Sequence, residues 1–507
     1  MQKGKNKNSI KFIISILFVV SFFAHETSAY TPMTSLTLIH PAASQPARFG
    51  VAYPGIEYNV RAAVIGGKFP YTYSLSGAPS GMNIDSQTGE ISWINPQATA
   101  NNVQITVVDS LGTSVNYTWT ITVTTNGFKF VDVEHGNDTG GDGSLNNPWQ
   151  TFGKVIATAA SSDIVYFREG TYTPTWSGDG WLSSSRAGTW LGYPGENVTF
   201  NFGLNSGYRL GITRQFYFDN LTFFNGSQWM LYVASNINRY VVRRCIFNDL
   251  NLTSGSNPAF IRYEDDVVAG TYGVIQDNTF HDTENTTKGS VSMYTQDYPL
   301  IEDNHIYDSG HTQIDLKEGI RWFTVRRNYI DNNGYGKSGP GGPGELSDDG
   351  GTNNRCSGEW TFNYIKANDP NYEYSAGGLY ICSDSTISNP QSLAFYRNTI
   401  YGLPYMSYCT DAKNVGPISF EHNVIINDNT SSDGDSADKI YNRQTTNFTN
   451  WSKTDNLLLG TADNGIDLST GALQGGYASY TGTRGWEFGS DPSDTIPPAN
   501  PNGLSVT

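Results

Sequence analysis

The segment Glu302-Asp303-Asn304-His305-Ile306 decides the fold, because its pattern of a strand end, an asparagine and an apolar pair recurs along the chain. Successive copies of the pattern are 24 to 35 residues apart. The asparagine position is taken by Asn220, Cys245, Asn278, Asn304, Asn328, Asn363, Asn398, Asn423 and Asn456. Repeats of this length cannot each bury an apolar face alone, so they stack into a solenoid with a continuous core.

The length of the repeat indicates which solenoid to expect. One coil of a β-helix needs roughly two dozen residues, and the surplus in the longer repeats is expected in loops. Stacked asparagines at an interior turn can hydrogen-bond to one another along the axis. A β-propeller is the alternative, but its blades need about 40 or more residues each. We therefore expect an all-β fold, a parallel β-helix.

The sequence changes in character at Phe128, where the solenoid is expected to begin. A short alanine-rich helix, at about residues 152–160, precedes a strand that ends in Gly170-Thr171-Tyr172. This succession resembles the start of secreted right-handed parallel β-helix proteins, in which a helix caps the first coil. The resemblance implies a right-handed parallel β-helix over residues 126–485.

Residues 30–125 are expected to form a small immunoglobulin-like β-sandwich ahead of the β-helix. Residues 103–107 and 119–123 alternate between apolar and polar side chains as strands do. The segment from Ala78 to Trp93 resembles the PxGLxxDxxTGxIxG signature of immunoglobulin-like, cadherin-like modules in bacterial surface proteins and secreted enzymes. The resemblance implies a spacer, or a module that binds carbohydrate or calcium, and we expect the spacer.

Composition and charge exclude several classes of protein. The 507 residues include 31 Lys and Arg against 47 Asp and Glu, for a formal net charge of −16. Only 15% of residues are charged and 13% are aromatic, a balance that favours strands over helix bundles and is too aromatic for a disordered chain. The acidic balance argues against nucleic acid as a partner, because phosphate binding needs clustered Lys and Arg.

The two ends of the chain are expected to lie outside these domains. Four lysines precede an apolar run at residues 12–24, and Thr27-Ser28-Ala29 is a small-residue cleavage site. This pattern predicts a signal peptide over residues 1–29, cleaved after Ala29, with an N-terminal membrane anchor as the alternative. No later run is long enough to span a membrane, so we expect a secreted monomer. Residues 486–507 resemble a Pro-rich linker, or the start of a fibronectin-type module.

The four cysteines do not form a disulfide framework or a zinc motif, because neither CxxC nor HExxH is present. Cys382 and Cys409 match in repeat register, which makes one disulfide between successive coils plausible.

The strand Ile314-Asp315-Leu316-Lys317 predicts a functional face. By alternation, Ile314 and Leu316 point inward and the two charged residues point outward. The repeat register places Tyr294 beside Lys317, on the preceding coil. The whole face is predicted to carry Arg262, Glu264, Tyr294, Asp315, Lys317, Asp348 and Asp349.

This strand and the later Asp348-Asp349-Gly350 are similar to the DGxxxK and NxxDDG elements of β-helix pectate lyases that use a lysine base. The β-helix alginate and chondroitin lyases also have a lysine on such a strand, with an arginine nearby. The resemblance implies that Lys317 is the base and that Asp315, Asp348 and Asp349 hold calcium.

The implied reaction is β-elimination on an extracellular acidic polysaccharide. Removing the C5 proton of a uronic acid requires that the neighbouring carboxylate be neutralised, by calcium or by Arg321 or Arg355. Lys317 must act as the neutral amine, which needs a depressed pKa, and His311 is a second acid/base candidate. Other candidates for substrate contacts are Arg262, Glu264, Tyr294, Tyr380, Arg326 and Arg327. The last two recur at another coil as Arg243 and Arg244, which makes turn residues the alternative for them.

Three alternatives remain open at this point. Asp315 and Lys317 could form a solvated surface ion pair, and Asp348-Asp349-Gly350 could be an ordinary turn. A glycoside hydrolase would need two carboxylates about 5–10 Å apart, which could come from Glu264, Asp315, Asp348 and Asp384. The protein could also be a non-catalytic glycan-binding adhesin.

Overall fold

The computed structural model describes residues 31–42, 46–174, 180–182, 185–203, 209–234, 236–250, 258–263, 270–283, 289–308, 312–317, 319–331, 344–347, 357–366, 379–381, 392–401, 404–406, 418–426, 441–442, 451–459, 473–474 and 478. The expected signal peptide, the C-terminal segment 486–507, Cys382 and Cys409 lie outside these ranges. Within them, no helix is both long enough and apolar enough to cross a membrane.

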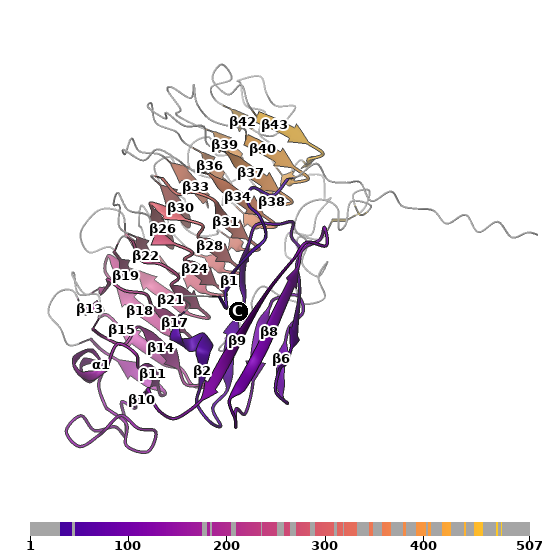
Figure 1. The fold of residues 1–507 in the computed structure, drawn as a ribbon. Helices are drawn as coiled ribbons and strands as arrows, with labels where there is room; N and C mark the ends of the chain where they lie inside the picture. The colour runs from indigo at the N-terminus through magenta and orange to yellow at the C-terminus, as the bar shows by residue number, and fades with distance from the viewer. Residues whose placement is uncertain are drawn as a thin grey trace, which may run out of the picture. The chain divides into compact units, whose positions relative to one another are not determined.

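The second domain is a parallel β-helix, as the repeat predicts. Its coils lie one above the next from β10 to β43 (Figure 1), and each complete coil supplies one strand to each of three parallel sheets. Sheet 1 contains β10 (Phe128–Val131), β11 (Ile164–Phe167), β14 (Thr189–Gly192), β17 (Tyr217–Asp219), β20 (Val241–Arg243), β24 (Val274–Gln276), β28 (Leu300–Glu302), β31 (Phe323–Arg326), β34 (Gly358–Thr361), β37 (Leu393–Tyr396), β40 (Ile418–Glu421) and β43 (Trp451–Thr454).

The other two sheets follow in each coil. Sheet 2 contains β12 (Gly170–Tyr172), β15 (Val198–Asn201), β18 (Thr222–Gly226), β21 (Ile246–Leu250), β25 (Thr279–His281), β29 (His305–Tyr307), β32 (Tyr329–Asp331), β35 (Tyr364–Lys366), β38 (Thr399–Tyr401), β41 (Val424–Ile426) and β44 (Leu457–Leu459). Sheet 3 contains β13 (Gly180–Leu182), β16 (Leu210–Ile212), β19 (Trp229–Val233), β22 (Ala259–Tyr263), β26 (Val291–Tyr294), β30 (Ile314–Lys317), β33 (Gly344–Ser347), β36 (Leu379–Ile381), β39 (Pro404–Met406) and β42 (Tyr441–Asn442). The short strands β23 (Gly270–Thr271) and β27 (Gln296–Asp297) pair between sheets 3 and 1.

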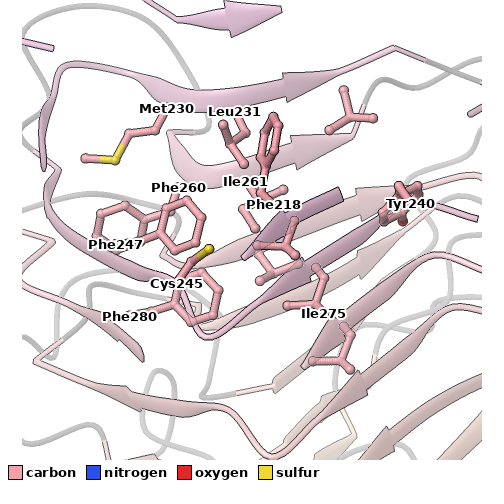
Figure 2. Packing of buried hydrophobic residues seen from close by; sticks show 14 of the residues in the cluster. Phe218, Met230, Leu231, Tyr240, Cys245, Phe247, Phe260, Ile261, Ile275 and Phe280 are labelled. Atoms are coloured by element: carbon pink, nitrogen blue, oxygen red, sulfur yellow. The ribbon is translucent and has the colours of Figure 1, made fainter. Parts of the chain in front are cut away.

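The interior of the solenoid is a continuous apolar core of inward-facing side chains. Phe223, Phe247 and Phe280 stack on successive coils, with ring centroids 4.8 and 4.9 Å apart. Figure 2 shows Phe247 and Phe280 in this core with Cys245 beside them. The expected cap is also present as helix α1 (Phe152–Thr158). Thr151 is its N-cap residue, and the Thr151 hydroxyl accepts a hydrogen bond from the Lys154 amide at 3.1 Å. Phe152 packs against Trp190 of the core.

The asparagines form the expected ladder between sheets 1 and 2. The Asn304 side-chain amide donates to Asn328 Oδ1 at 2.9 Å, and Asn328 donates to Asn363 Oδ1 at 3.0 Å. The same bonds continue to Asn398, Asn423 and Asn456. Each amide also donates to a backbone carbonyl of the preceding coil, so the ladder satisfies polar groups that the core has removed from water.

The assignment of Asn220 to the ladder is wrong by one residue. Asp219 is in register with Arg243, so Asn220 aligns with Arg244, and the buried Leu221 aligns with Cys245. Asn220 and Arg244 both have a positive φ, of 59° and 48°. Asparagine is favoured in that left-handed conformation as well as in the ladder, which explains the error. Cys245 does occupy a ladder position, because its amide donates to Asn278 Oδ1 at 2.9 Å.

The N-terminal module is the expected β-sandwich. Its elements are β1 (Thr37–His40), the 3₁₀-helix η1 (Ala47–Gly50), β2 (Val51–Ala52), β3 (Tyr58–Arg61), β4 (Ala63–Ile65), β5 (Thr72–Ser76), β6 (Met82–Ile84), β7 (Glu90–Trp93), β8 (Ala100–Val108) and β9 (Ser114–Val123). The strands pair as β1-β4, β3-β7-β6 and β2-β9-β8-β5.

The module and sheet 1 share one apolar core. The outward-facing residues of sheet 1 pack with the interior of the module and include Tyr166, Tyr217, Val241, Val274 and Leu300. Phe49 of the module, for example, meets the Tyr217 ring edge-on at 5.7 Å. The expectation of a spacer is not met, because the module forms a covering layer of sheet 1.

Buried charges also join the module to sheet 1. Arg326 bonds to Glu302 through Nε at 2.8 Å, to the Tyr71 hydroxyl at 2.9 Å and to the Val64 carbonyl at 3.0 Å. Arg61 of the module pairs with Asp303, which also pairs with Arg327. Arg326 and Arg327 are thus bonded to carboxylates inside this interface, which argues against a contact of either with substrate.

Candidate functional site

The outward side of sheet 3 carries the candidate site, and its register matches the sequence-based expectation. Tyr294 on β26 is directly opposite Lys317 on β30. The position two residues earlier on each strand forms a second row, in which Ser292 is opposite Asp315. Arg262 on β22 is opposite Ser292 and continues this row.

Polar contacts connect the second row across three strands. Arg262 Nη1 donates to the Ser292 hydroxyl at 3.2 Å, and that hydroxyl donates to Asp315 Oδ2 at 3.0 Å. A serine hydroxyl can accept one bond and donate another, so it can relay between a cation and an anion. Arg262, Ser292 and Asp315 are thereby held in one chain of hydrogen bonds.

Tyr294 lies within this charged group. The Arg262 guanidinium is 3.9 Å from the centroid of the Tyr294 ring, a cation–π contact. Burial raises the pKa of Tyr294, and Asp315 reinforces the rise, while Arg262 and Lys317 oppose it. Tyr294 therefore keeps its proton at neutral pH and can act as a hydrogen-bond donor.

Asp315 and Lys317 are far less exposed than a solvated surface pair. Asp315 is 1% exposed and Lys317 is 5% exposed, although alternation places both on the outward side of the strand. The interpretation of these two residues as an ordinary solvated pair is therefore wrong. Charges withheld from water interact strongly with their surroundings, and such groups are common at functional sites.

The register adds a carboxylate that sequence reasoning did not select. Glu345 on β33 is directly opposite Asp315, and Ser347 is opposite Lys317. Tyr380 on β36 is opposite Glu345 and extends the same row, as expected of a residue on this face. The alternation in the segment Gly344–Ser347 is the signal that could have identified Glu345, but the preceding glycine-rich stretch left the register open.

Arg321 lies beside this face and is bonded to a carboxylate. It follows β30 and bridges to Asp297 of β27, where Arg321 Nε donates to Asp297 Oδ1 at 2.6 Å. Its guanidinium also stands 5.1 Å from the Trp322 ring centroid. Neutralisation of a substrate carboxylate by Arg321 stays a prediction. In that role Arg321 would have to act together with Asp297.

Several predicted site residues lie outside the residues that the structure describes: Glu264, His311, Asp348, Asp349, Arg355 and Asp384. Among the described residues, no group of three or more His, Cys, Asp or Glu side chains is arranged to hold a metal ion. The calcium prediction names two residues outside this part of the chain, so it stays a prediction.

A cavity of about 410 Å³ lies away from sheet 3, between the module and sheet 1. It is lined by both parts of the chain, including Arg48 and Glu57 of the module and Asp219 and Arg244 of the β-helix. Asp219 there is already paired with Arg244 Nε at 2.7 Å. The charges of this cavity serve the interface, and the candidate site remains the row on sheet 3.

The module matches a known family of domains. Residues 36–124 match the He_PIG family, whose description is "Putative Ig domain". No curated protein is significantly similar in sequence to the chain.

The solved structures that are similar to the chain include three at low identity. A rhamnogalacturonan lyase is 10% identical with a TM-score of 0.41, over 69% of this chain and 91% of its own. Pectate lyase Pel9A is 13% identical with a TM-score of 0.38, over 67% and 78%. A GH136 lacto-N-biosidase from Eubacterium ramulus is 10% identical with a TM-score of 0.39, over 66% and 67%. Similarity at this level says nothing about the reaction of this chain.

Proposed function

We propose that the protein is a secreted enzyme that cleaves a uronic-acid-containing polysaccharide by β-elimination, with Lys317 as the base. The observation that carries the proposal is the placement of Lys317, which is 5% exposed and directly opposite Tyr294 on the outward side of sheet 3. A lysine used as a base must be neutral, and burial favours the neutral amine. The Asp315 carboxylate favours the charged ammonium instead, so a cation near Lys317 is needed to offset it.

Arg262 supplies a fixed cation at this site. Arg262 is held by the Ser292 hydroxyl and by the Tyr294 ring. Its strand is one before the strand of Tyr294 and two before the strand of Lys317. In the proposed reaction, Lys317 takes the C5 proton, the electron pair forms the C4–C5 double bond, and the C4–O bond to the leaving sugar breaks. Neutralising the substrate carboxylate lowers the barrier to the first step, and a guanidinium can do this by paired hydrogen bonds. In the proposed reaction, Tyr294, which keeps its proton at neutral pH, donates it to the leaving oxygen.

The proposal also assigns calcium to Asp315 together with Asp348 and Asp349. A hard cation prefers such carboxylates and would supply positive charge next to the substrate. Removal of calcium by a chelator tests this part separately from the role of Lys317.

Glycoside hydrolysis is the second candidate, because Asp315 and Glu345 are opposite each other on adjacent strands. Adjacent strands are about 4.8 Å apart. Retaining glycosidases use two carboxyl groups about 5–5.5 Å apart, so a pair of carboxylates at these two strand positions would suit that chemistry.

The decisive experiment compares two products. The full chain, Lys317→Ala and Lys366→Ala are incubated with polygalacturonate, alginate and glycosaminoglycans, with and without chelator. Lys366 is a suitable control because it is a half-buried lysine on sheet 2, paired with Asp331 at 3.2 Å. Elimination gives the ultraviolet absorbance of an unsaturated uronate, which Lys317→Ala should lose and Lys366→Ala should keep. Reducing ends without that absorbance would instead favour the hydrolase, and the absence of both products on every polymer would contradict both reactions.

A further inference from the structure

A cluster of two aromatic rings and an arginine lies on sheet 3, beginning one strand before Arg262. Trp229 and Tyr232 of β19 stack with ring centroids 4.9 Å apart. The guanidinium carbon of Arg209, next to β16, is 4.8 Å from the Trp229 ring and 4.5 Å from the Tyr232 ring. All three side chains are half-buried, so each keeps some surface exposed.

The local chain path explains why both rings are on the outside. Met230 and Leu231 lie between them and are both fully buried. Figure 2 shows these two side chains in the core, as it does the corresponding Phe260 and Ile261 of β22. Two consecutive inward residues interrupt the alternation of the strand. Trp229 and Tyr232, three positions apart, can therefore share the outer face.

This cluster continues the row of the candidate site. Tyr232 is opposite Arg262, Arg262 is opposite Ser292, and Ser292 is opposite Asp315. Tyr232 is thus three strands before Asp315, or about 14 Å at about 4.8 Å per strand. Figure 1 shows β19, β22, β26 and β30 following one another along the solenoid.

Arginines and aromatic rings alternate along this face. The Arg209, Trp229 and Tyr232 cluster comes first, and the contact between Arg262 and the Tyr294 ring follows it towards Lys317. A chain of acidic sugars has matching chemistry, since each ring has an apolar C–H face and a carboxylate. The C–H face packs on an aromatic ring, whose face is electronegative, and the carboxylate pairs with a guanidinium.

We propose that Arg209, Trp229 and Tyr232 form a binding subsite for a uronic acid unit of the polymer, three strands from the reacting sugar. This inference rests on the proposed function, because it assumes that the polymer lies along sheet 3 across Asp315 and Lys317. It makes the enzyme selective for long acidic chains, since a short oligosaccharide at Lys317 does not reach the cluster.

A second aromatic stack offers a matched control. Tyr272, Tyr298 and Trp322 stack on successive coils with centroids 5.2 and 4.8 Å apart, and Arg239 covers Tyr272. These residues lie in the turns between sheets 3 and 1, outside the row of the candidate site. Tyr298 has a neighbouring ring on both of its faces, so no face remains on which a sugar could pack.

The test measures polymer binding rather than turnover. Trp229→Ala, Arg209→Gln and Tyr298→Ala are each made in the full chain that carries Lys317→Ala, and binding to polygalacturonate, alginate and neutral dextran is followed by affinity electrophoresis. We expect Trp229→Ala to weaken binding to at least one acidic polymer about tenfold. Arg209→Gln should weaken the same binding and reduce its salt dependence. Tyr298→Ala should bind like the parent chain.

Unchanged binding in both Trp229→Ala and Arg209→Gln would overturn the subsite, even if Lys317 proves to be the base. Equal losses in Tyr298→Ala would also overturn it, because the effect would then not be local to sheet 3. If Lys317→Ala loses no activity but Trp229→Ala still loses binding, the lyase proposal fails and the cluster remains a sugar-binding site. Thermal unfolding of every variant shows whether it folds, and Arg209→Gln, which alters only a half-buried polar group, provides the test if Trp229→Ala does not.

Discussion

The Arg326 guanidinium of the β-helix donates a hydrogen bond to the Tyr71 hydroxyl of the N-terminal module at 2.9 Å, across 255 residues of sequence. Burial raises the pKa of Tyr71, so its hydroxyl stays neutral and accepts the bond. Arg326 is also bonded to Glu302, and its guanidinium lies 4.8 Å from the Phe69 ring. One buried cation therefore links both domains, and stability of the β-helix should depend on the module.

Replacing Arg326 by methionine should destabilise the protein by about 3–5 kcal/mol, because the buried Glu302 would lose its close cation partner and keep Arg61 at 3.9 Å. The free energy of unfolding in urea measures the effect. Arg168→Met is the control, since Arg168 and Glu196 form a partly exposed pair with 33% and 18% of their side chains accessible. That pair should contribute less, about 1 kcal/mol or below. Similar losses of unfolding free energy in Arg326→Met and Arg168→Met would contradict the role given to Arg326.

Asp277→Asn should raise stability at neutral pH. Burial raises the pKa of Asp277 to about 6, with Asp303 and Glu90 adding to the rise and Arg61 and Arg243 opposing it. Between the unfolded pKa of about 3.9 and this value, the folded state holds a proton that the unfolded state has lost. Stability therefore falls as the pH rises from about 4 to 6.

The asparagine variant lacks this ionisation and tolerates the φ of 59° at that position. Melting temperatures at pH 4 and pH 7 check the prediction: the variant should gain stability relative to the parent between these two values. A constant difference across this window would show that Asp277 does not titrate in it.

Asn328→Ala should lower the free energy of unfolding more than Asn456→Ala, although both remove one ladder residue. Asn328 is fully buried, accepts from the Asn304 amide, and donates to the Ile301 carbonyl at 2.9 Å. Each buried group left without a partner costs about 1–3 kcal/mol. Asn456 is half-buried, so water can replace some of the hydrogen bonds that its partners lose in the variant. Urea unfolding of the two variants should rank them in this order, and the reverse order would argue against the ladder as a source of stability.

Ser292→Ala should lower the proposed lyase activity by about fivefold, the equivalent of one hydrogen bond of about 1 kcal/mol. The substitution breaks the link between Arg262 and Asp315 without touching Lys317. Ser292→Thr keeps the hydroxyl and should restore most of the rate. A fall in rate that threonine does not rescue would indicate a packing effect instead.

Much of the fold follows from two local rules that the sequence displays. Alternation along Ile314–Lys317 predicted which residues face outward, and the repeat spacing predicted that Tyr294 is opposite Lys317. The error at Asn220 has a physical cause, because a left-handed turn and a ladder position both favour asparagine. The register with the next strand separates these two roles.

The sequence does not reveal what covers each face. Alternation shows that Asp315 and Lys317 point outward, but it does not show that they are 1% and 5% exposed. In the same way, Arg243 and Arg326 resemble ordinary turn residues, while their partners Asn59 and Tyr71 are 184 and 255 residues away. Such pairings depend on how two domains dock, which no local pattern encodes.

The asparagine ladder also bears on how a protein of this kind can diversify. Successive rungs are 26, 24 and 35 residues apart, yet the same bond joins each pair. Each asparagine bond fixes the position of its coil relative to the next coil. An insertion in one coil is therefore accommodated within that coil and leaves the neighbouring coils in place. Natural selection can therefore lengthen one loop at a time and change what the outer surface recognises, while the scaffold beneath is inherited intact.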